Sequence, residues 1–149
     1  MAKTTKRRRS RIKAVIMLYQ SDLLNKDVNS IISSEMDFNK HIDDFTIKLV
    51  FGVEKHKNEI DNQIRSVVEN WTLDRIAIID RNILRMAIYE MLFEEDIPLK
   101  VSVDEAIEIA KIFGQKEETP KFVNGILGKI LVNINKEKEK EKNKNSNLN

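Results

Sequence analysis

At the centre of the chain stands the segment Ile76-Ala-Ile-Ile-Asp-Arg-Asn-Ile-Leu-Arg-Met-Ala-Ile-Tyr-Glu-Met-Leu-Phe93. Wound as an α-helix it is apolar on most of its sides, and such a helix belongs in the middle of the packing. Its charged residues are Asp80, Arg81, Arg85 and Glu90. Because burying an unpaired charge is costly, we expect them to reach solvent or partners. We therefore predict an all-α domain built around this helix.

Composition supports helices and excludes several classes of protein. The 149 residues include only four Gly and two Pro, and alternating β-branched runs are missing. A chain of this length is most simply one domain. No apolar run is long enough to span a membrane, and no apolar region follows the basic start as in a secretory signal. Cysteine is absent, which excludes disulfides and thiolate metal sites and suits a reducing, cytoplasmic compartment.

Three helices are predicted before the central segment, over residues 6–24, near 28–34 and over about 39–69. The apolar stripe of the first consists of Ile12, Val15, Ile16, Tyr19 and Leu23. His56 falls on the apolar stripe of the third helix. We interpret it as a partly buried histidine rather than a metal ligand, because no second ligand neighbours it. By the same reasoning His41 is a surface residue.

Capping residues delimit the helices that follow. Ser102 and Glu105 form the pattern of a capping box, in which each side chain satisfies an orphan amide of the other. Gly114 is placed to end that helix in the left-handed conformation. Thr119 is then the predicted N-cap of a last helix, and Pro120 is its first helical residue.

Domain organisation follows from a break and a change in composition. Trp71-Thr72 marks the break between two halves, with Thr72 as a predicted N-cap. After Ile134 the chain turns to Lys-Glu repeats and then Asn, a composition that cannot offset its ordering entropy. We predict a flexible basic end (1–5), one helical domain (6–135, with subdomains 6–70 and 71–135) and a disordered tail (136–149).

Charge is distributed very unevenly. The first 13 residues contain no acid but hold Lys3, Lys6, Arg7, Arg8, Arg9, Arg11 and Lys13, whereas residues 14–135 are acidic in balance. Such a basic start attracts polyphosphate, because each neutralised phosphate releases a counterion. A nuclear localisation signal or a solvated terminus fits the same charges. Cations at a helix N-terminus oppose the macrodipole, so this start should fray when free and tighten on an anion.

Motifs of catalysis are missing from the sequence. It contains no Gly-rich phosphate loop, no paired-His zinc motif and no nucleophile with a base beside it. We therefore expect no enzyme activity, cofactor or metal. Gly125-Ile-Leu-Gly128 has the form of the KH-domain loop, which needs a flanking sheet. Both glycines fall within a predicted amphipathic helix, so close helix packing is the preferred explanation.

Four segments occur together in a recognisable order: Leu18-Tyr-Gln20, Asp80–Glu90, Val103–Gly114 and Lys121–Leu127. Together they resemble the NusB family of bacterial transcription antitermination factors, over roughly residues 6–134. The resemblance implies about seven helices in two small packed bundles. It also implies binding to the boxA element of nascent RNA together with NusE, a ribosomal protein. The pair would then join the elongating RNA polymerase with other Nus factors and suppress termination, notably in ribosomal RNA operons.

The resemblance also implies site residues. The RNA-contacting set is Lys6, Arg7, Arg8, Arg9, Arg11, Lys121 and Phe122, which combines cations for phosphate with an aromatic plane for bases. Glu118 beside it would temper RNA affinity by repulsion, and Tyr19 and Asp80 match the NusE contact. The spacing of Phe122 and the stripe position of Tyr19 fit core positions equally well.

Two other functions remain open from the residues. NusB-like domains also form the N-terminal part of some ribosomal RNA cytosine methyltransferases, so the chain could be a related RNA-binding or structural module without catalysis. It could also be a structural homodimer that masks its RNA surface. Sedimentation with and without RNA would separate the dimer from the antitermination factor.

Overall fold

The computed structural model describes residues 5–38, 41–68, 72–114 and 117–146. In them the chain forms seven α-helices and one short 3₁₀-helix, and no strand. The elements are α1 (Lys6–Leu24), α2 (Val28–Asp37), α3 (Asp44–Lys55), α4 (Lys57–Val67), η1 (Leu73–Arg75), α5 (Ile78–Phe93), α6 (Leu99–Phe113) and α7 (Glu118–Ser146). The predicted all-α class and number of helices are confirmed.

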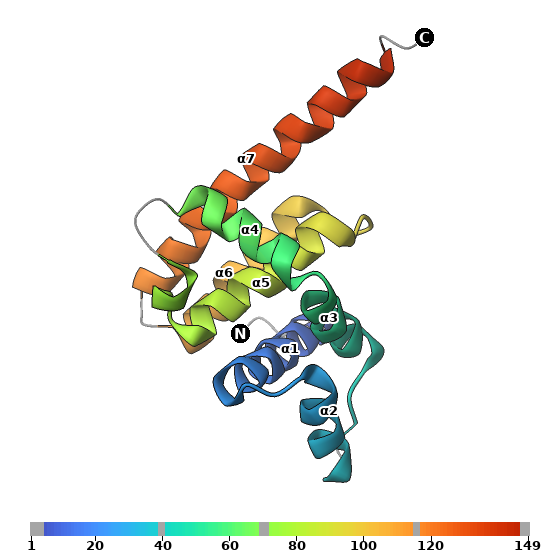
Figure 1. Cartoon of the computed structure of the whole chain (residues 1–149), viewed down its shortest axis with the longest axis vertical. Coiled ribbons are helices and arrows are strands. Elements are labelled where there is room, and N and C mark those ends of the chain that lie inside the picture. The colour runs from blue at the N-terminus through green and yellow to red at the C-terminus, as the bar shows by residue number, and fades with distance from the viewer. Residues whose placement is uncertain (1–4, 39–40, 69–71, 115–116, 147–149) are drawn as a thin grey trace.

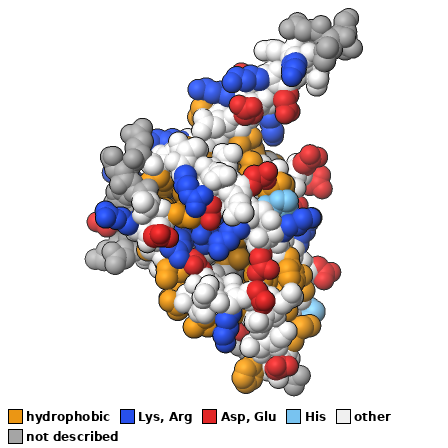
Figure 2. Space-filling model, in the orientation of Figure 1, with side chains coloured by type: hydrophobic (Ala, Val, Ile, Leu, Met, Phe, Trp, Pro, Cys, Tyr) orange, Lys and Arg blue, Asp and Glu red, His pale blue; other side chains and the backbone are white. Residues whose placement is uncertain are grey.

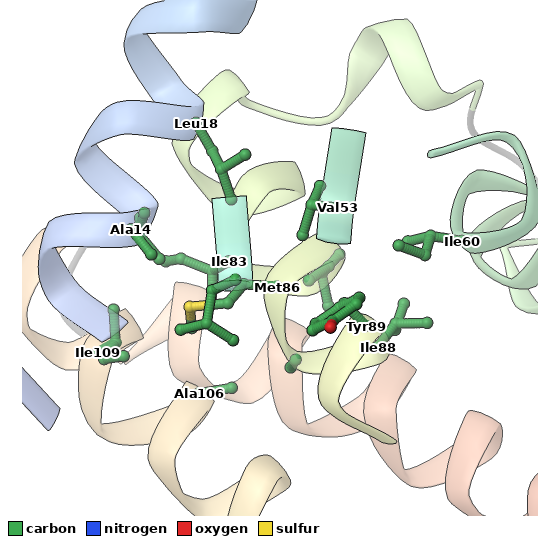
Figure 3. Close-up of a cluster of buried hydrophobic side chains, with 14 of the residues drawn as sticks. Ala14, Leu18, Val53, Ile60, Ile83, Met86, Ile88, Tyr89, Ala106 and Ile109 are labelled. Carbon is green, nitrogen blue, oxygen red and sulfur yellow. The ribbon is translucent and has the colours of Figure 1, made fainter. Parts of the chain in front are cut away.

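Helix α5 lies at the centre of the molecule, as its sequence predicts. Residues 82–91 are all buried, and α5 packs against α1, α3, α4, α6 and α7 (Figure 1). Figure 3 shows Ile83 and Met86 of α5 among side chains of α1 and α6, such as Leu18 and Ile109. Both predicted halves therefore contribute to one core around a shared helix.

Helix α1 has the predicted bounds but buries a different face. Its Thr5 cap accepts a hydrogen bond from the Arg8 amide at 3.0 Å, which ties down the helix start. The buried apolar side chains are Ala14, Val15, Met17 and Leu18. Ile16 and Leu23, predicted as core, are 38% and 51% exposed, because α3 and α5 pack on the Ala14 side. Two of the five residues of the expected stripe are thus left at the surface.

The prediction of one long helix over residues 39–69 is wrong, because this segment forms two helices, α3 and α4. They meet at His56, whose φ of −107° and ψ of 20° interrupt the helical path. The imidazole stacks on Phe93 of α5 with ring centroids 3.9 Å apart. The break lets α3 pack on α1 while α4 packs on α5 and α7. His56 is half-buried and His41 exposed, as predicted.

The ends of the last two helices, α6 and α7, differ from the predicted caps. Helix α6 begins directly after Pro98, so Ser102 and Glu105 lie inside it and form no capping box. Gly114 is extended, with φ −89° and ψ 179°, instead of left-handed. A glycine is needed there for another reason, since a Cβ would overlap the Thr119 side chain. Helix α7 begins one residue before Thr119, which is buried within its first turn.

The structure differs in part from the predicted break at Trp71-Thr72 and from the predicted disordered tail. Trp71 and residues 1–4 lie outside the described residues, and Thr72 precedes η1 without a side-chain capping hydrogen bond. Residues 136–146, expected to be disordered, continue α7 as an exposed helix that projects from the body (Figures 1 and 2). Lys and Glu are good helix formers, and pairs such as Glu137 with Lys140 support the helix further.

Candidate nucleic-acid interface

The first turns of α1 (residues 6–13, here called the arm) lie between α3 and the turn that joins α5 to α6. Lys6, Arg7 and Arg9 are exposed, and Arg8 is partly so. A cleft of about 470 Å³ separates the arm from the α5–α6 turn and is lined by Pro98 among others. The absence of an acid in the first turn of α1 keeps this end of the helix cationic.

Arg11, which belongs to the predicted RNA-contacting set, is almost fully buried against an acid. It is 3% exposed and donates to both oxygens of Glu90 at 2.7 and 2.9 Å. Ser102 donates to the same carboxylate at 3.2 Å. Since Glu90 is itself 1% exposed, the pair depends on contacts within the protein, and Nη1 of Arg11 also lies 3.9 Å from Oε2 of Glu105. Arg11 therefore anchors the arm to α5 and α6.

Arg8 is held by a second carboxylate. Its Nε and Nη2 donate to Glu105 of α6 at 2.8 and 3.0 Å in a bidentate pair. Hydrogen bonding between Arg8 and Glu105 lowers the pKa of the Glu105 carboxyl and raises the pKa of the Arg8 guanidinium. The charge of Arg8 is thus compensated within the protein, although one edge of the side chain still reaches solvent.

The surroundings of Arg7 differ from those of Arg8 and Arg11. Its guanidinium carbon lies 4.5 Å from the centroid of the Phe45 ring on α3, and that of Arg11 lies 5.3 Å from it. Among the described residues, no carboxylate pairs with Arg7. A guanidinium over an aromatic face is attracted by the negative face of the ring. Arg7 therefore brings an uncompensated positive charge to the exposed side of the arm.

Asp43 holds α1 and α3 in register beneath the arm. Its carboxylate caps α3 by accepting from the backbone and side chain of Thr46, and it accepts from the Ser10 hydroxyl at 2.6 Å. Burial alone would raise the pKa of Asp43, but these hydrogen bonds outweigh it and lower the pKa to about 2. The carboxylate therefore stays ionised and the link between the two helices persists at neutral pH.

The remaining predicted site residues gather in a second place, an apolar groove. Ile79 and Phe113 lie at its centre and are shared by two hollows of about 470 and 420 Å³. The first hollow is also lined by Asp80, Glu118 and Phe122, and the second by Tyr19. We call this the groove: Ile16, Tyr19, Gln20, Ile76, Ala77, Ile79, Asp80, Phe113, Gly114, Glu118, Thr119 and Phe122.

The structure thus divides the predicted RNA-contacting set. Phe122 is half-buried in the groove beside Asp80, a residue predicted for the protein partner, and Lys121 next to it is exposed. Arg8 and Tyr19 are eleven residues apart on α1, which at 1.5 Å per residue is about 16 Å. The arm and the groove are therefore neighbouring sites along one helix rather than a single patch.

Asp80 stands out among the groove residues. It is half-buried in the first turn of α5, and burial raises the pKa of its carboxyl. Within the described part of the chain no cation pairs with it. The adjacent Arg81 is instead committed to Asp22, at 2.6 and 2.7 Å. A desolvated acid in an apolar groove is suited to a cation supplied by a binding partner.

Several residues that shape these sites were not predicted. Phe45 carries no sequence signal beyond its place on an apolar stripe, and Glu105 was assigned to a cap. Ile79 belongs to the central segment expected in the middle of the packing, and Phe113 had no place in the predicted site. In the described ranges no group of three His, Cys, Asp or Glu side chains is arranged to hold a metal. Likewise, no helix there is both long and apolar enough to cross a membrane.

Most of the chain is similar in sequence to known proteins. The model of the NusB family matches residues 8–132. Transcription antitermination proteins NusB of Bacillus pumilus (strain SAFR-032) and Bacillus subtilis (strain 168) are 48% and 47% identical. The alignments cover 84% and 88% of this chain and 94% and 98% of the relatives.

Solved structures show the same fold. The NusB structure of T. maritima matches with a TM-score of 0.74 at 39% identity, over 86% of this chain and 92% of that one. A crystal structure of the antitermination factors NusB and NusE in complex with dsRNA matches with a TM-score of 0.73 at 26% identity. It covers 85% of this chain and 97% of that chain.

Proposed function

The chain belongs to the NusB family of transcription antitermination proteins, and on that premise we propose that it binds boxA RNA together with NusE. The complex then joins the elongating RNA polymerase with other Nus factors and carries it through terminators in ribosomal RNA operons. The observation that carries the proposal is the pairing of a cationic arm with a neighbouring apolar groove on the same helix. A related complex contains both NusE and RNA.

The arm supports the RNA part of the proposal. Lys6, Arg7 and Arg9 are exposed on one helical turn, where they add to each other's field and attract phosphates. Lys121 and Phe122 are proposed to extend this surface, with the half-buried ring of Phe122 offered to a base. Glu118, exposed beside them, would weaken RNA binding by repulsion.

The groove supports the protein part. Tyr19, Ile79 and Phe113 present apolar surface, and the half-buried Asp80 adds a negative charge without a described partner. A basic ribosomal protein with an apolar segment is complementary to that combination. Because α1 carries both sites, NusE and RNA can be bound side by side, and each can contact the other.

Fluorescence anisotropy of a labelled boxA RNA tests the proposal. We expect the protein to prefer single-stranded boxA RNA to a scrambled RNA, and to bind it more tightly with NusE. Titrations at several salt concentrations should give a slope of about 0.7 per engaged phosphate. A boxA duplex is included, because the related complex contains dsRNA. Equal binding to boxA and scrambled RNA, with no effect of NusE, would contradict the proposal.

Two pairs of variants separate the sites. Arg7→Ala with Arg9→Ala should weaken RNA binding and reduce the salt slope by about 0.7 for each phosphate that the variant no longer engages. The control, Lys55→Ala with Lys57→Ala, removes two exposed charges elsewhere and should leave both quantities unchanged. Asp80→Asn should reduce the effect of NusE without changing RNA binding by the protein alone, whereas Asp37→Asn should change neither.

A further inference from the structure

Phe45 lies under the arm, with its ring against the guanidinium groups of Arg7 and Arg11. It is the second residue of α3, is half-buried and packs against the core, so its ring has little freedom. Asp43, just before it in the capping position, fixes the start of α3 against Ser10 of α1. The ring is therefore held from below while its upper side meets the guanidinium of Arg7.

The arginines of the arm differ in what balances their charge. Arg11 is buried against Glu90, and Arg8 is paired with Glu105 through two hydrogen bonds. The charge of Arg7 has an aromatic ring as its described partner instead of an acid. A ring attracts the cation without neutralising it and without using its N–H groups. Arg7 thus keeps both its charge and its donors for a ligand.

The ring below the guanidinium also limits how those donors are directed. A guanidinium is planar with five N–H donors in its plane, so a ring against one face leaves the donors directed outward. A free arginine loses rotamer freedom when it binds, and a side chain already held in one orientation loses less. The arrangement suits a phosphate, which accepts two parallel hydrogen bonds from one guanidinium.

We propose that Phe45 is a positioning residue of the RNA site, whose ring holds the guanidinium of Arg7 for an RNA phosphate. In this arrangement Arg7 is the phosphate ligand, whereas Arg8 and Arg11 fasten the arm to α5 and α6. Phe45 itself does not touch the RNA. This inference rests on the proposed binding of boxA RNA, and deepens it by assigning different tasks to the arginines of one motif.

Substitution of the ring tests the inference. Phe45→Leu keeps an apolar side chain but removes the π face, and we expect the dissociation constant for boxA RNA to rise about two- to fivefold. Phe45→Tyr and Phe45→Trp keep a π face and should restore binding to within about twofold. Phe51→Leu, at a half-buried phenylalanine on the same helix, is the matched control and should bind like the wild type. Circular dichroism of each variant is the check that it is folded.

A double-mutant cycle with Arg7→Ala gives the decisive readout. If Phe45 acts through Arg7, adding Phe45→Leu to Arg7→Ala will weaken binding no further. An equal loss in both backgrounds would overturn the inference, because the ring would then contact the RNA itself or support the fold in general. Wild-type affinity separates the two proposals: no boxA binding there defeats the proposed function, whereas binding that Phe45→Leu leaves unchanged defeats only the inference.

Discussion

At the scale of single residues, Asp22 joins the end of α1 to the start of α5. Its carboxylate accepts hydrogen bonds from Arg81 at 2.6 and 2.7 Å, from Asn82 at 2.9 Å and from Arg85 at 2.9 Å. Burial alone would raise the pKa of Asp22, but the bonds from Arg81 and Asn82 and the charges of Arg85 and Arg81 lower it to about 2. The cluster is therefore sensitive to acid.

Asp22→Asn is expected to lower the free energy of unfolding at pH 7 by about 2 kcal/mol. Because the pKa is depressed in the folded state, this contribution is complete above the unfolded value of 3.8 and is lost as the pH falls through about 2. Urea unfolding at a series of pH values should show wild type and variant converging between pH 4 and 2. A constant difference would contradict the assignment. Asp104→Asn, at an exposed site, is the control.

Arg11→Met tests whether the arm is anchored by the pair with Glu90. The change leaves a buried carboxylate without its partner, which typically lowers stability by about 3–5 kcal/mol. The double variant Arg11→Met with Glu90→Gln removes the stranded charge and should recover part of that loss. Urea unfolding measures both, with the exposed Lys100→Met as the control. A loss below about 1 kcal/mol would show that Arg11 is not the anchor.

At the scale of elements, the glycines of α7 carry an energetic cost that packing does not offset. A Cβ at Gly125 or Gly128 would meet nothing within 4 Å, so the expected close packing at these positions is wrong. Glycine in a helix interior is less stable than alanine, chiefly because it loses more backbone entropy. These two positions are open helix surface that follows Lys121 and Phe122 along the chain.

Gly125→Ala and Gly128→Ala should therefore each stabilise the protein by about 0.5–1 kcal/mol. Thermal unfolding followed by circular dichroism provides the measurement. Gly52→Ala is the matched control and should destabilise, because its Cβ would overlap the ring of Tyr89. Destabilisation by both α7 variants would mean that these glycines are packed after all.

At the scale of the whole molecule, the halves on either side of residue 70 share one helix. Helix α5 packs on α1, α3 and α4 from the first half and on α6 and α7 from the second (Figure 1). The pairs Arg11–Glu90 and Arg8–Glu105 join the same halves by charge. Neither half can bury its apolar surface without α5, so their stabilities are coupled.

The chain should accordingly unfold in one cooperative transition. Native-state hydrogen exchange should show the most protected amides of α3 and of α6 opening with the same free energy and the same dependence on denaturant. A fragment of residues 6–70 alone should be largely unfolded by circular dichroism. Distinct opening energies for the two helices, or a folded fragment, would show two independent subdomains.

Much of this architecture could be predicted from local sequence patterns. The bounds of α1, the central place of α5 and the cationic arm follow from periodicity, apolar content and charge, which are properties of neighbouring residues. The errors fall where a local pattern has two solutions. The apolar spacing over 39–69 continues through His56 although the chain bends there, and Ser102 resembles a cap although Pro98 already starts the helix.

By itself the sequence determined that the chain is all-α, that the central helix α5 is buried and that the basic start of α1 is exposed. These properties follow from helical periodicity and charge, which are set residue by residue. Only the tertiary structure decided which cations remain available. Arg8 meets Glu105, 97 residues away, and Arg11 meets Glu90, 79 residues away, whereas Arg7 meets the ring of Phe45. Such pairings depend on how helices cross, and packing geometry is a property of the whole chain.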